Sequence, residues 1–135
     1  MFVVASLDFR YGWSSIPFWL SVLADVLVLT GLWIVYRVFK SNSYTAATIE
    51  VNEDQPLVQD GPYAIVRHPM YSGGAILVLA TPVALGSWWA LLCAVPLIVV
   101  IAVRAVDEER LLLKELPGYA EYRRKVRYRI IPQVW

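Results

Sequence analysis

The first residues that could carry chemistry lie in a short polar box at residues 61–74, which reads GPYAIVRHPMYSGG and holds the only histidine of the chain. Pro69 suits the first turn of a helix, where a missing N–H costs nothing, so His68 would cap that helix. The free N–H groups of the first turn would then point back toward His68 and form a site for an anion. His68 and Tyr71 share a helix face, and Arg67 adds a fixed positive charge. The box therefore offers a ligand a cation, hydrogen-bond donors and an aromatic ring.

A second group of candidates lies further along the chain and consists of Arg104, Asp107, Glu108 and Glu109. Arg104 and Glu108 are four residues apart and share one helix face, whereas Glu109 points about 100° away. These carboxylates would meet a cationic ligand, and Arg104 would meet an anionic one. The alternative is a solvated helix end with an intrahelical ion pair, which is worth only about 0.2–0.5 kcal/mol.

The box also has a purely structural interpretation. Gly73 and Gly74 lack side chains where a ligand or a neighbouring helix must come close, and such glycines serve helix packing in lipid. Arg67 and His68 would then be interfacial anchors. The single histidine and the single cysteine, Cys93, argue against a zinc or non-haem iron site. The net charge of +1 gives no basic field for nucleic acid, and no phosphate-binding or dinucleotide-binding glycine motif is present.

The elements that must position these groups are membrane helices. Hydrophobic residues make up 59% and charged residues 17% of the 135 residues, whereas a soluble domain is about 45–50% apolar and about 25% charged. Residues 16–39 are the first predicted span, since about 24 residues cross a hydrocarbon core of about 30 Å. Asp25 lies well inside it. It would contact substrate or another helix, or else face the bundle as a neutral or hydrogen-bonded group. Residues 8–17 are polar and aromatic and fit an interfacial belt.

A helical hairpin is predicted at residues 71–116. Its first arm is broken by Pro82, a turn follows at residues 86–89, and its second arm runs unbroken from Trp88 to about Leu116 with a kink at Pro96. The last turns of this long arm would project into water. Residues 48–51, in the polar loop before the box, would form a short strand or an extended lid.

The predicted fold is a single all-α integral membrane domain of residues 1–135, with about three spans and an interfacial tail at residues 117–135. In the tail, Tyr119, Tyr122 and Val126 share one face and the neighbouring arginines point elsewhere, which fits an amphipathic segment near anionic lipid. The Lys and Arg residues gather at one end of all three spans, and the positive-inside rule makes this end cytosolic. The hairpin then returns the second group of candidates to the same membrane boundary as the box.

Together the two groups match the chemistry of S-adenosylmethionine, which carries a sulfonium, an ammonium, a carboxylate and an adenine. Carboxylates suit its two cations, an arginine or a helix start suits its carboxylate, and a tyrosine suits its adenine or sulfonium. We therefore expect one cofactor site that holds Arg67, His68, Tyr71, Glu108 and Glu109.

The motif of residues 61–63 and 66–71, followed by Gly73, an apolar hairpin and the pair Glu108-Glu109, resembles the isoprenylcysteine carboxyl methyltransferase family. The phospholipid N-methyltransferases share much of this pattern, and the resemblance continues to Pro132. It implies a multi-pass membrane methyltransferase that uses S-adenosylmethionine from the cytosolic side on a lipophilic acceptor. The cofactor pocket would be lined by Arg67, His68, Tyr71, Gly73, Glu108 and Glu109. Arg104 would be the catalytic residue, orienting an acceptor carboxylate for attack on the sulfonium methyl without a general base.

Three other functions stay open. The first is phospholipid N-methylation. The second is an NADPH-dependent sterol-type reductase, since residues 126–132 also look like the end of those enzymes, although they are far longer. The third is a non-catalytic membrane homologue, since members of the family usually have further membrane helices before the part that matches here. The sequence does not name the acceptor, and it leaves oligomerisation open.

Overall fold

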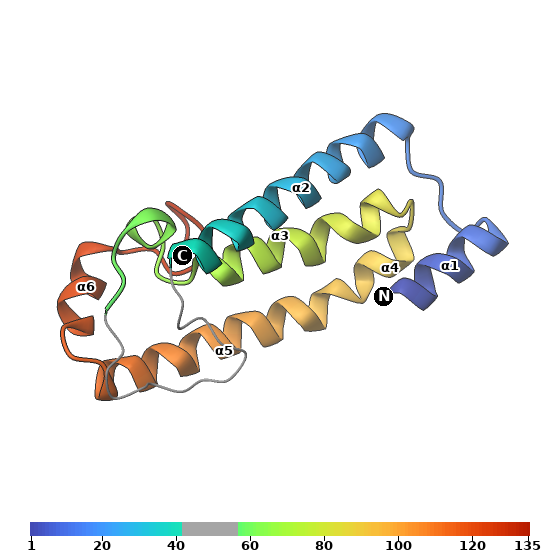
Figure 1. The fold of residues 1–135 in the computed structure, drawn as a ribbon. Coiled ribbons are helices and arrows are strands. Elements are labelled where there is room, and N and C mark those ends of the chain that lie inside the picture. The colour runs from blue at the N-terminus through green and yellow to red at the C-terminus, as the bar shows by residue number, and fades with distance from the viewer. Residues whose placement is uncertain (42–56) are drawn as a thin grey trace.

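The computed structural model describes residues 1–41 and 57–135, and all regular structure in these two ranges is helical (Figure 1). The elements in order are α1 (Phe2–Tyr11), α2 (Phe18–Ser41), the 3₁₀-helix η1 (Gly61–Ala64), α3 (Pro69–Ala84), α4 (Trp88–Leu92), α5 (Ala94–Glu115) and α6 (Tyr119–Lys125). The predicted all-helical class is thus confirmed for the described residues. The strand or lid expected at residues 48–51 lies outside them.

Three long helices form the body of the molecule, with α3 between α2 and α5 (Figure 1). The short helix α1 packs against α4 at one end of this body, and α6 closes the other end. We refer to these as the α1 end and the α6 end. Because α2 runs toward the α6 end and the chain re-enters there through η1, the polar box and the last turns of α5 meet at the α6 end.

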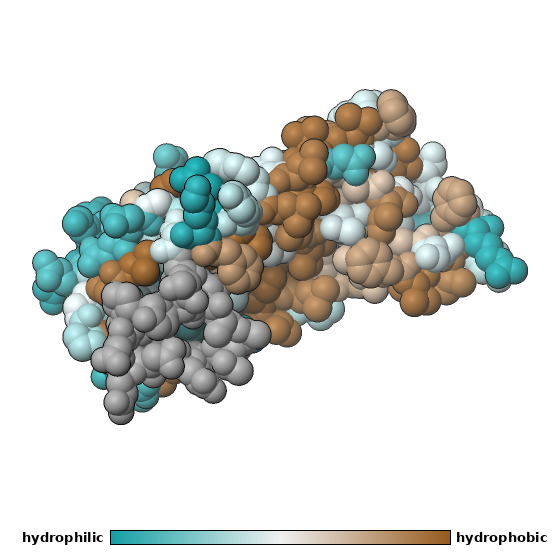
Figure 2. All heavy atoms as spheres, in the orientation of Figure 1, coloured by the Kyte–Doolittle hydropathy of each residue, from teal (hydrophilic) through white to brown (hydrophobic). Residues whose placement is uncertain are grey.

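Two helical segments are long and apolar enough to cross a membrane: Phe18–Ser41, and Trp88–Glu115 taken together. Only 11% and 17% of their most apolar windows are buried, so most of their apolar side chains face outward, as lipid-facing side chains do. Figure 2 shows hydrophobic residues over the middle of the visible face and hydrophilic ones at the α6 end. Helix α3 has 16 residues and is about 24 Å long, less than a hydrocarbon core of about 30 Å. The third span therefore stays a prediction.

Asp25 does not face the bundle, as one of the two sequence interpretations had it. Its side chain is exposed on the outer surface of α2. The neighbouring Ala24 is buried instead, because one residue along a helix turns the side chain by about 100°. The helix packs on α3 through its small residues and leaves Asp25 outside this contact.

The hairpin helices are not broken where the sequence predicted, at Pro82, and the second arm has a break that the sequence did not predict. Helix α3 continues through Pro82 and ends at Ala84, so Pro82 does not break it. The turn at Gly86, where φ is +76°, follows as expected. The second arm is not unbroken, because it is interrupted at Cys93 between α4 and α5. Pro96 explains this break, since a proline cannot donate to the carbonyl four residues earlier and its ring crowds that carbonyl.

Two glycines allow α2 and α3 to approach closely. A Cβ atom added to Gly73 would lie 2.9 Å from Val35 Cγ2 and 3.0 Å from the carbonyl oxygen of Gly31. A Cβ atom added to Gly31 would lie 2.9 Å from Leu77 Cγ and 3.1 Å from the carbonyl oxygen of Gly73. Small facing residues are the usual basis of close helix packing in lipid.

The α1 end is held by a buried carboxylate. Asp8, expected in an interfacial segment, belongs to α1 and is only 1% exposed. Its oxygens accept hydrogen bonds from the backbone N–H of Ser14 at 2.7 Å, from the Ser14 hydroxyl at 2.6 Å and from the Ser87 hydroxyl. Ser87 also caps α4 by accepting from the N–H of Ala90 at 3.0 Å. One aspartate therefore ties α1 to the start of α4.

The α6 end has its own small core, and the shared face predicted for Tyr119, Tyr122 and Val126 forms part of it. That the tail lies in the membrane interface stays a prediction. Tyr119, Tyr122 and Val126 are buried together with Leu116, while the neighbouring arginines of α6 are exposed. After α6 the chain is extended and returns along the polar box. The backbone N–H groups of residues 67 and 68 donate to the carbonyls of residues 128 and 129 at 2.9 and 2.8 Å. The tail thus forms one wall around the box.

Candidate functional site

Helix α3 begins within the polar box, as the sequence predicted. His68 is the N-cap residue and Pro69 is the first helical residue. The first turn offers fewer free donors than expected, however. The N–H groups of Tyr71 and Ser72 donate to the carbonyl of His68 at 3.0 and 3.1 Å. Side chains, and not the helix start, therefore provide most of the polar groups here.

Glu109 is the centre of the site and is only 2% exposed. Its Oε1 accepts from Arg67 Nε, and its Oε2 accepts from Arg129 Nε at 2.8 Å. Arg67 is fixed further, because its Nη1 donates to the carbonyls of Val126 at 2.7 Å and Arg127 at 2.6 Å. A buried carboxylate stays charged only when paired and hydrogen-bonded in this way. This ion pair therefore joins α5, the box and the returning tail.

Glu108, Tyr71 and Arg104 form a second chain of contacts beside the first. The Tyr71 hydroxyl donates to Glu108 Oε2 at 2.5 Å, and Arg104 Nε donates to the Tyr71 oxygen at 2.9 Å. The expected link between Arg104 and Glu108 therefore runs through a tyrosine from the facing helix. The Glu108 side chain is 30% exposed, against 3% for that of Glu109. Glu108 is the carboxylate that a ligand can reach.

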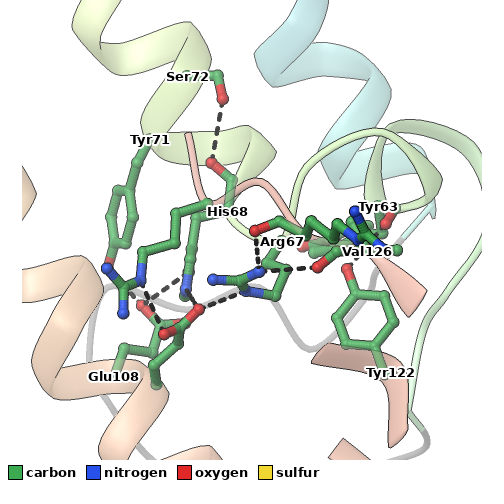
Figure 3. A network of polar contacts seen from close by, with 11 residues as sticks. Tyr63, Arg67, His68, Tyr71, Ser72, Glu108, Tyr122 and Val126 are labelled. Carbon is green, nitrogen blue, oxygen red and sulfur yellow. Dashed lines mark hydrogen bonds and ion pairs between the residues drawn. The ribbon is translucent and has the colours of Figure 1, made fainter. Parts of the chain in front are cut away.

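His68 lies between the two carboxylates and stacks on Tyr71, with ring centroids 5.6 Å apart and planes inclined by 22° (Figure 3). Its Nδ1 is 4.0 Å from Glu108 Oε2 and its Nε2 is 3.7 Å from Glu109 Oε1. Both distances exceed normal hydrogen-bond length. His68 Nε2 is buried and has no hydrogen-bond partner among the described residues. A buried nitrogen without a hydrogen-bond partner, on a ring that also lies beside the reachable Glu108, is the mark of a site with unused binding capacity.

The structure thus brings together six of the seven predicted site residues: Arg67, His68, Tyr71, Arg104, Glu108 and Glu109. We call these six the polar cluster. Gly73 lies instead in the contact between α2 and α3, and its predicted role toward a cofactor stays untested. An added Cβ atom at Gly74 would meet nothing within 4 Å, so no close approach explains that glycine. Asp107 lies on the exposed side of α5 and pairs with Arg110 at 3.1 Å.

Sequence reasoning missed two residues that support the polar cluster. Arg129, taken only as part of the basic tail, is a direct partner of Glu109. The Ser72 hydroxyl donates to the carbonyl of Ile130 at 2.6 Å and fixes the returning tail to α3. The alternation of apolar and arginine residues from Val126 to Ile130 was the available signal, because it indicates an extended segment with one buried face.

Two buried tyrosines of α6, Tyr119 and Tyr122, lie next to the polar box. The Tyr122 hydroxyl donates to the carbonyl of Tyr63 at 2.8 Å (Figure 3). The Tyr119 hydroxyl is buried without a hydrogen-bond partner among the described residues. Burial raises the pKa of both Tyr119 and Tyr122, and the charge of Glu109 raises each further. Both therefore remain neutral hydroxyl groups at physiological pH.

The arrangement suits a ligand that carries charges of both signs. Glu108 presents a carboxylate to a cation, and Arg104 presents a guanidinium to an anion. The face of Tyr71 and the ring of His68 give an aromatic surface on which a cation or a flat ring can rest. The described residues contain no cluster of three or more His, Cys, Asp or Glu side chains that could hold a metal ion.

Known proteins match this chain, and a family model covers the region that contains the site. A family model described as phospholipid methyltransferase matches residues 19–118. A phosphatidylethanolamine N-methyltransferase of Saccharomyces cerevisiae is 35% identical over 71 residues, which are 50% of this chain and 8% of the yeast protein. A protein-S-isoprenylcysteine O-methyltransferase of Schizosaccharomyces pombe is 40% identical over 77 residues, which are 56% of this chain and 33% of that protein.

The chain spans less than two thirds of the length of both relatives, and the two differ in the acceptor that their names give. What their names share is methyl transfer, and the resemblance noted in the sequence is confirmed at that level. The family model covers the first predicted span, the polar box and both arms of the hairpin, including the whole polar cluster. The chain therefore belongs to the phospholipid methyltransferase family.

Proposed function

We propose that this protein transfers a methyl group from S-adenosylmethionine to a lipophilic acceptor at the polar cluster. The observation that carries the proposal is the buried ring of His68, whose Nε2 has no hydrogen-bond partner among the described residues and whose Nδ1 lies 4.0 Å from the reachable carboxylate of Glu108. Membership of a methyltransferase family supports the reaction class. The donor set fits the cofactor because carboxylate, guanidinium, imidazole and phenol groups match its charges and its aromatic base.

Each residue of the polar cluster would have a distinct task. S-adenosylmethionine supplies an activated methyl group when it is bound. Glu108 would hold positive charge, and Tyr71 would offer its ring face. His68 would use its free nitrogen to hydrogen-bond the ligand. Glu109, Arg67 and Arg129 would act indirectly, since their ion pairs fix the backbone and side chains around the site.

Arg104 would orient the acceptor. It lies on α5 at the edge of the apolar part of the helix and donates to the Tyr71 oxygen through Nε. A guanidinium can bind a carboxylate through two parallel hydrogen bonds, which fixes the position of the attacking oxygen. Proximity and exclusion of water would then provide most of the rate. This favours carboxyl O-methylation, as in the isoprenylcysteine relative.

Phospholipid N-methylation is the second candidate. It is favoured by the family model and by the yeast relative, whose name gives phosphatidylethanolamine as its acceptor. In this case Glu108 would hold the ammonium group of the acceptor, and Arg104 would face its phosphate. The two candidates share the cofactor and differ in the charge of the acceptor.

The site would face the cytosol. Arg37 and Lys40 end α2 at the α6 end, and the basic tail lies there as well. By the positive-inside rule this end faces the cytosol, where S-adenosylmethionine is made. A cysteine introduced into α6 and a cysteine introduced at Trp13 should therefore react with a membrane-impermeant reagent from opposite sides of the membrane.

Cofactor binding tests the proposal directly. Isothermal titration of the purified protein should show binding of S-adenosylmethionine that His68→Ala and Glu108→Ala each remove. Asp107→Ala is the matched control, because Asp107 is an exposed acid on the same helix outside the polar cluster. Binding of NADPH in place of S-adenosylmethionine would overturn the proposal, and binding of neither would favour a non-catalytic homologue.

Transfer of labelled methyl groups identifies the acceptor. With isolated membranes and labelled S-adenosylmethionine, a base-labile methyl ester in the product indicates O-methylation, and a stable methylamine indicates N-methylation. Arg104→Ala should reduce turnover far more than cofactor affinity. Equal losses of both would instead place Arg104 in contact with the cofactor.

A further inference from the structure

A pocket lies at the α6 end beside the polar cluster. Arg67 belongs to the polar cluster and also lines this pocket. It has a volume of about 490 Å³ and opens between α6 and the last residues of the chain. Six of its lining residues are Arg67, Arg123, Arg124, Arg127, Arg129 and Trp135. We call it the arginine pocket. Five of its eight lining residues are arginines, so it is a strongly basic surface.

Among the described residues, a single side-chain carboxylate forms ion pairs with the arginines of this pocket. Arg67 and Arg129 share the single carboxylate of Glu109. The side chains of Arg123, Arg124 and Arg127 are exposed, and none forms an ion pair with a described residue. Like charges held close together repel unless an anion lies between them. The arrangement is therefore stabilised when an anion enters.

The geometry of the donors favours a phosphate group over a single carboxylate. Arginine binds phosphate oxygens through a planar fork of two N–H groups, and several arginines around one phosphate satisfy its oxygens together. S-adenosylmethionine is a poor candidate, because its sulfonium and ammonium groups would face this positive field. The arginine pocket is thus chemically distinct from the proposed cofactor site.

The rim of the pocket indicates where the phosphate comes from. Ile131, Val134 and Trp135 are 50%, 75% and 37% exposed, although all three are apolar. Tryptophan is enriched at the head-group level of membranes, and basic side chains beside exposed apolar ones are typical of segments that lie in the interface. A soluble phosphate compound would not account for the apolar rim.

The rim is also held in place before any ligand arrives. The carbonyl oxygen of Trp135 accepts from the N–H groups of Arg129, Ile130 and Ile131 at 2.8, 3.0 and 3.1 Å. The guanidinium of Arg129 lies over the Trp135 ring, 5.2 Å from its centroid. A site that is ordered in advance loses less conformational entropy on binding.

We propose that the arginine pocket binds the phosphate of an anionic phospholipid, with Trp135 and Val134 inserted beside it into the same leaflet. Bound lipid would fix α6 and the returning tail against the membrane. Because the tail carries Arg129 and the carbonyls that hold Arg67, lipid at this pocket would also stabilise the wall of the polar cluster. The lipid here is a bound ligand and not the methyl acceptor, so this proposal stands whether or not the protein transfers methyl groups.

Native mass spectrometry of the detergent-purified protein tests the proposal. Phosphatidylglycerol, phosphatidylcholine and glycerol phosphate are each added at equal concentration. We expect one phosphatidylglycerol to bind at least about tenfold more tightly than phosphatidylcholine, since each basic residue near a membrane surface contributes about 1 kcal/mol toward anionic lipid. Glycerol phosphate should not displace it.

The variant that removes the pocket is Arg123→Gln, Arg124→Gln and Arg127→Gln together. These side chains are exposed and unpaired among the described residues, so the triple change leaves the contacts of Glu109 intact. It should abolish the preference for phosphatidylglycerol. The control of equal net charge is Arg10→Gln, Arg37→Gln and Arg110→Gln, outside the pocket, which should keep the preference. The triple Arg→Lys change at the pocket should keep part of it.

Each possible result either supports or overturns the binding of an anionic phospholipid at the arginine pocket. Equal binding of the two lipids, or an unchanged preference in the pocket variant, overturns the pocket as an anion site. Displacement by glycerol phosphate retains the anion site but overturns lipid as its occupant. If the pocket variant does not fold, the Arg→Lys variant decides, because complete loss of preference despite its retained charge would also contradict binding by these side chains.

Discussion

The two ends of the molecule each bury a carboxylate, and they do so in different ways. At the α1 end, Asp8 receives hydrogen bonds from neutral groups, the hydroxyls of Ser14 and Ser87 and backbone N–H groups. At the α6 end, Glu109 receives charged donors from Arg67 and Arg129. In the first arrangement, both oxygens of the carboxylate are hydrogen-bonded within the fold. The second includes His68 Nε2, a buried nitrogen without a partner among the described residues.

The difference shows that burial of a charged group does not by itself mark a functional site. Both carboxylates are nearly inaccessible, at 1% and 2% exposure. What distinguishes the α6 end is the capacity left over after the fold has satisfied its own groups. It has a reachable Glu108, a His68 nitrogen without a hydrogen-bond partner among the described residues, and a surplus of arginines. A buried network that is complete stabilises the fold, whereas one with spare donors and acceptors can bind a ligand.

The largest expected effect comes from removing the centre of the charged network. Glu109→Ala leaves the guanidinium groups of Arg67 and Arg129 without their carboxylate. Breaking a buried ion pair on one side costs about 3–5 kcal/mol, so thermal unfolding in detergent should shift strongly and cofactor binding should be lost. Glu109→Gln should recover part of the stability. A melting temperature unchanged in Glu109→Ala would mean that the network contributes little.

The matching change at the α1 end should be smaller and should leave the polar cluster intact. Asp8→Ala leaves the donors of Ser14 and Ser87 without an acceptor, which costs about 1–3 kcal/mol. The folded fraction should bind S-adenosylmethionine as the wild type does. If Asp8→Ala reduces cofactor affinity in folded protein, the two ends are coupled and the contrast between them fails.

Gly73 tests the region between the two ends. Gly73→Ala places a methyl group 3.0 Å from the carbonyl of Gly31, and overpacking of this kind costs about 1–3 kcal/mol. Gly74→Ala is the control, since an added Cβ atom there meets nothing, and it should stabilise the helix by about 0.4–1 kcal/mol. Loss of cofactor affinity in Gly73→Ala at unchanged stability would support the original prediction that Gly73 lines the cofactor pocket.

The smallest effect concerns acid pH. Burial raises the pKa of Asp8, but the hydrogen bonds from Ser14 and Ser87 outweigh burial and hold this pKa below its usual value of 3.8. A lowered pKa in the folded state means that Asp8 stabilises the fold fully above its ordinary pKa and loses this contribution as the pH falls through the folded pKa. The difference in melting temperature between wild type and Asp8→Ala should therefore be constant near neutral pH and shrink in the acid range. A constant difference down to the lowest pH would contradict this assignment.

The sequence predicted the helices and most of the polar cluster for clear physical reasons. Long apolar runs fix the membrane helices, and Pro69 fixes the start of α3 with His68 as its cap. The hairpin then brings Glu108 and Glu109 to the box, as expected. These features depend on local chemistry or on chain length, both of which are readable from residue types.

What sequence reasoning missed depends on long-range pairing. The partnership of Arg129 with Glu109 requires the tail to return along the box through backbone hydrogen bonds, which side-chain types do not reveal. Asp8 was placed at the interface because its partner Ser87 lies in a distant turn. The orientation of Asp25 was open because a helix period alone does not say which side of α2 packs on α3.

The hydrogen bond between Ser87 and Asp8 also has a consequence for synthesis. It joins residues 79 positions apart, and at about 5–20 residues per second a ribosome needs about 4–16 s to add that length of chain. During this interval the Asp8 carboxylate can accept from Ser14 but not from Ser87. Helices α2 and then α3 are completed meanwhile and can pair through Gly31 and Gly73. Helix α1 is made before α2 and α3 and is therefore the last of these three to reach its final place.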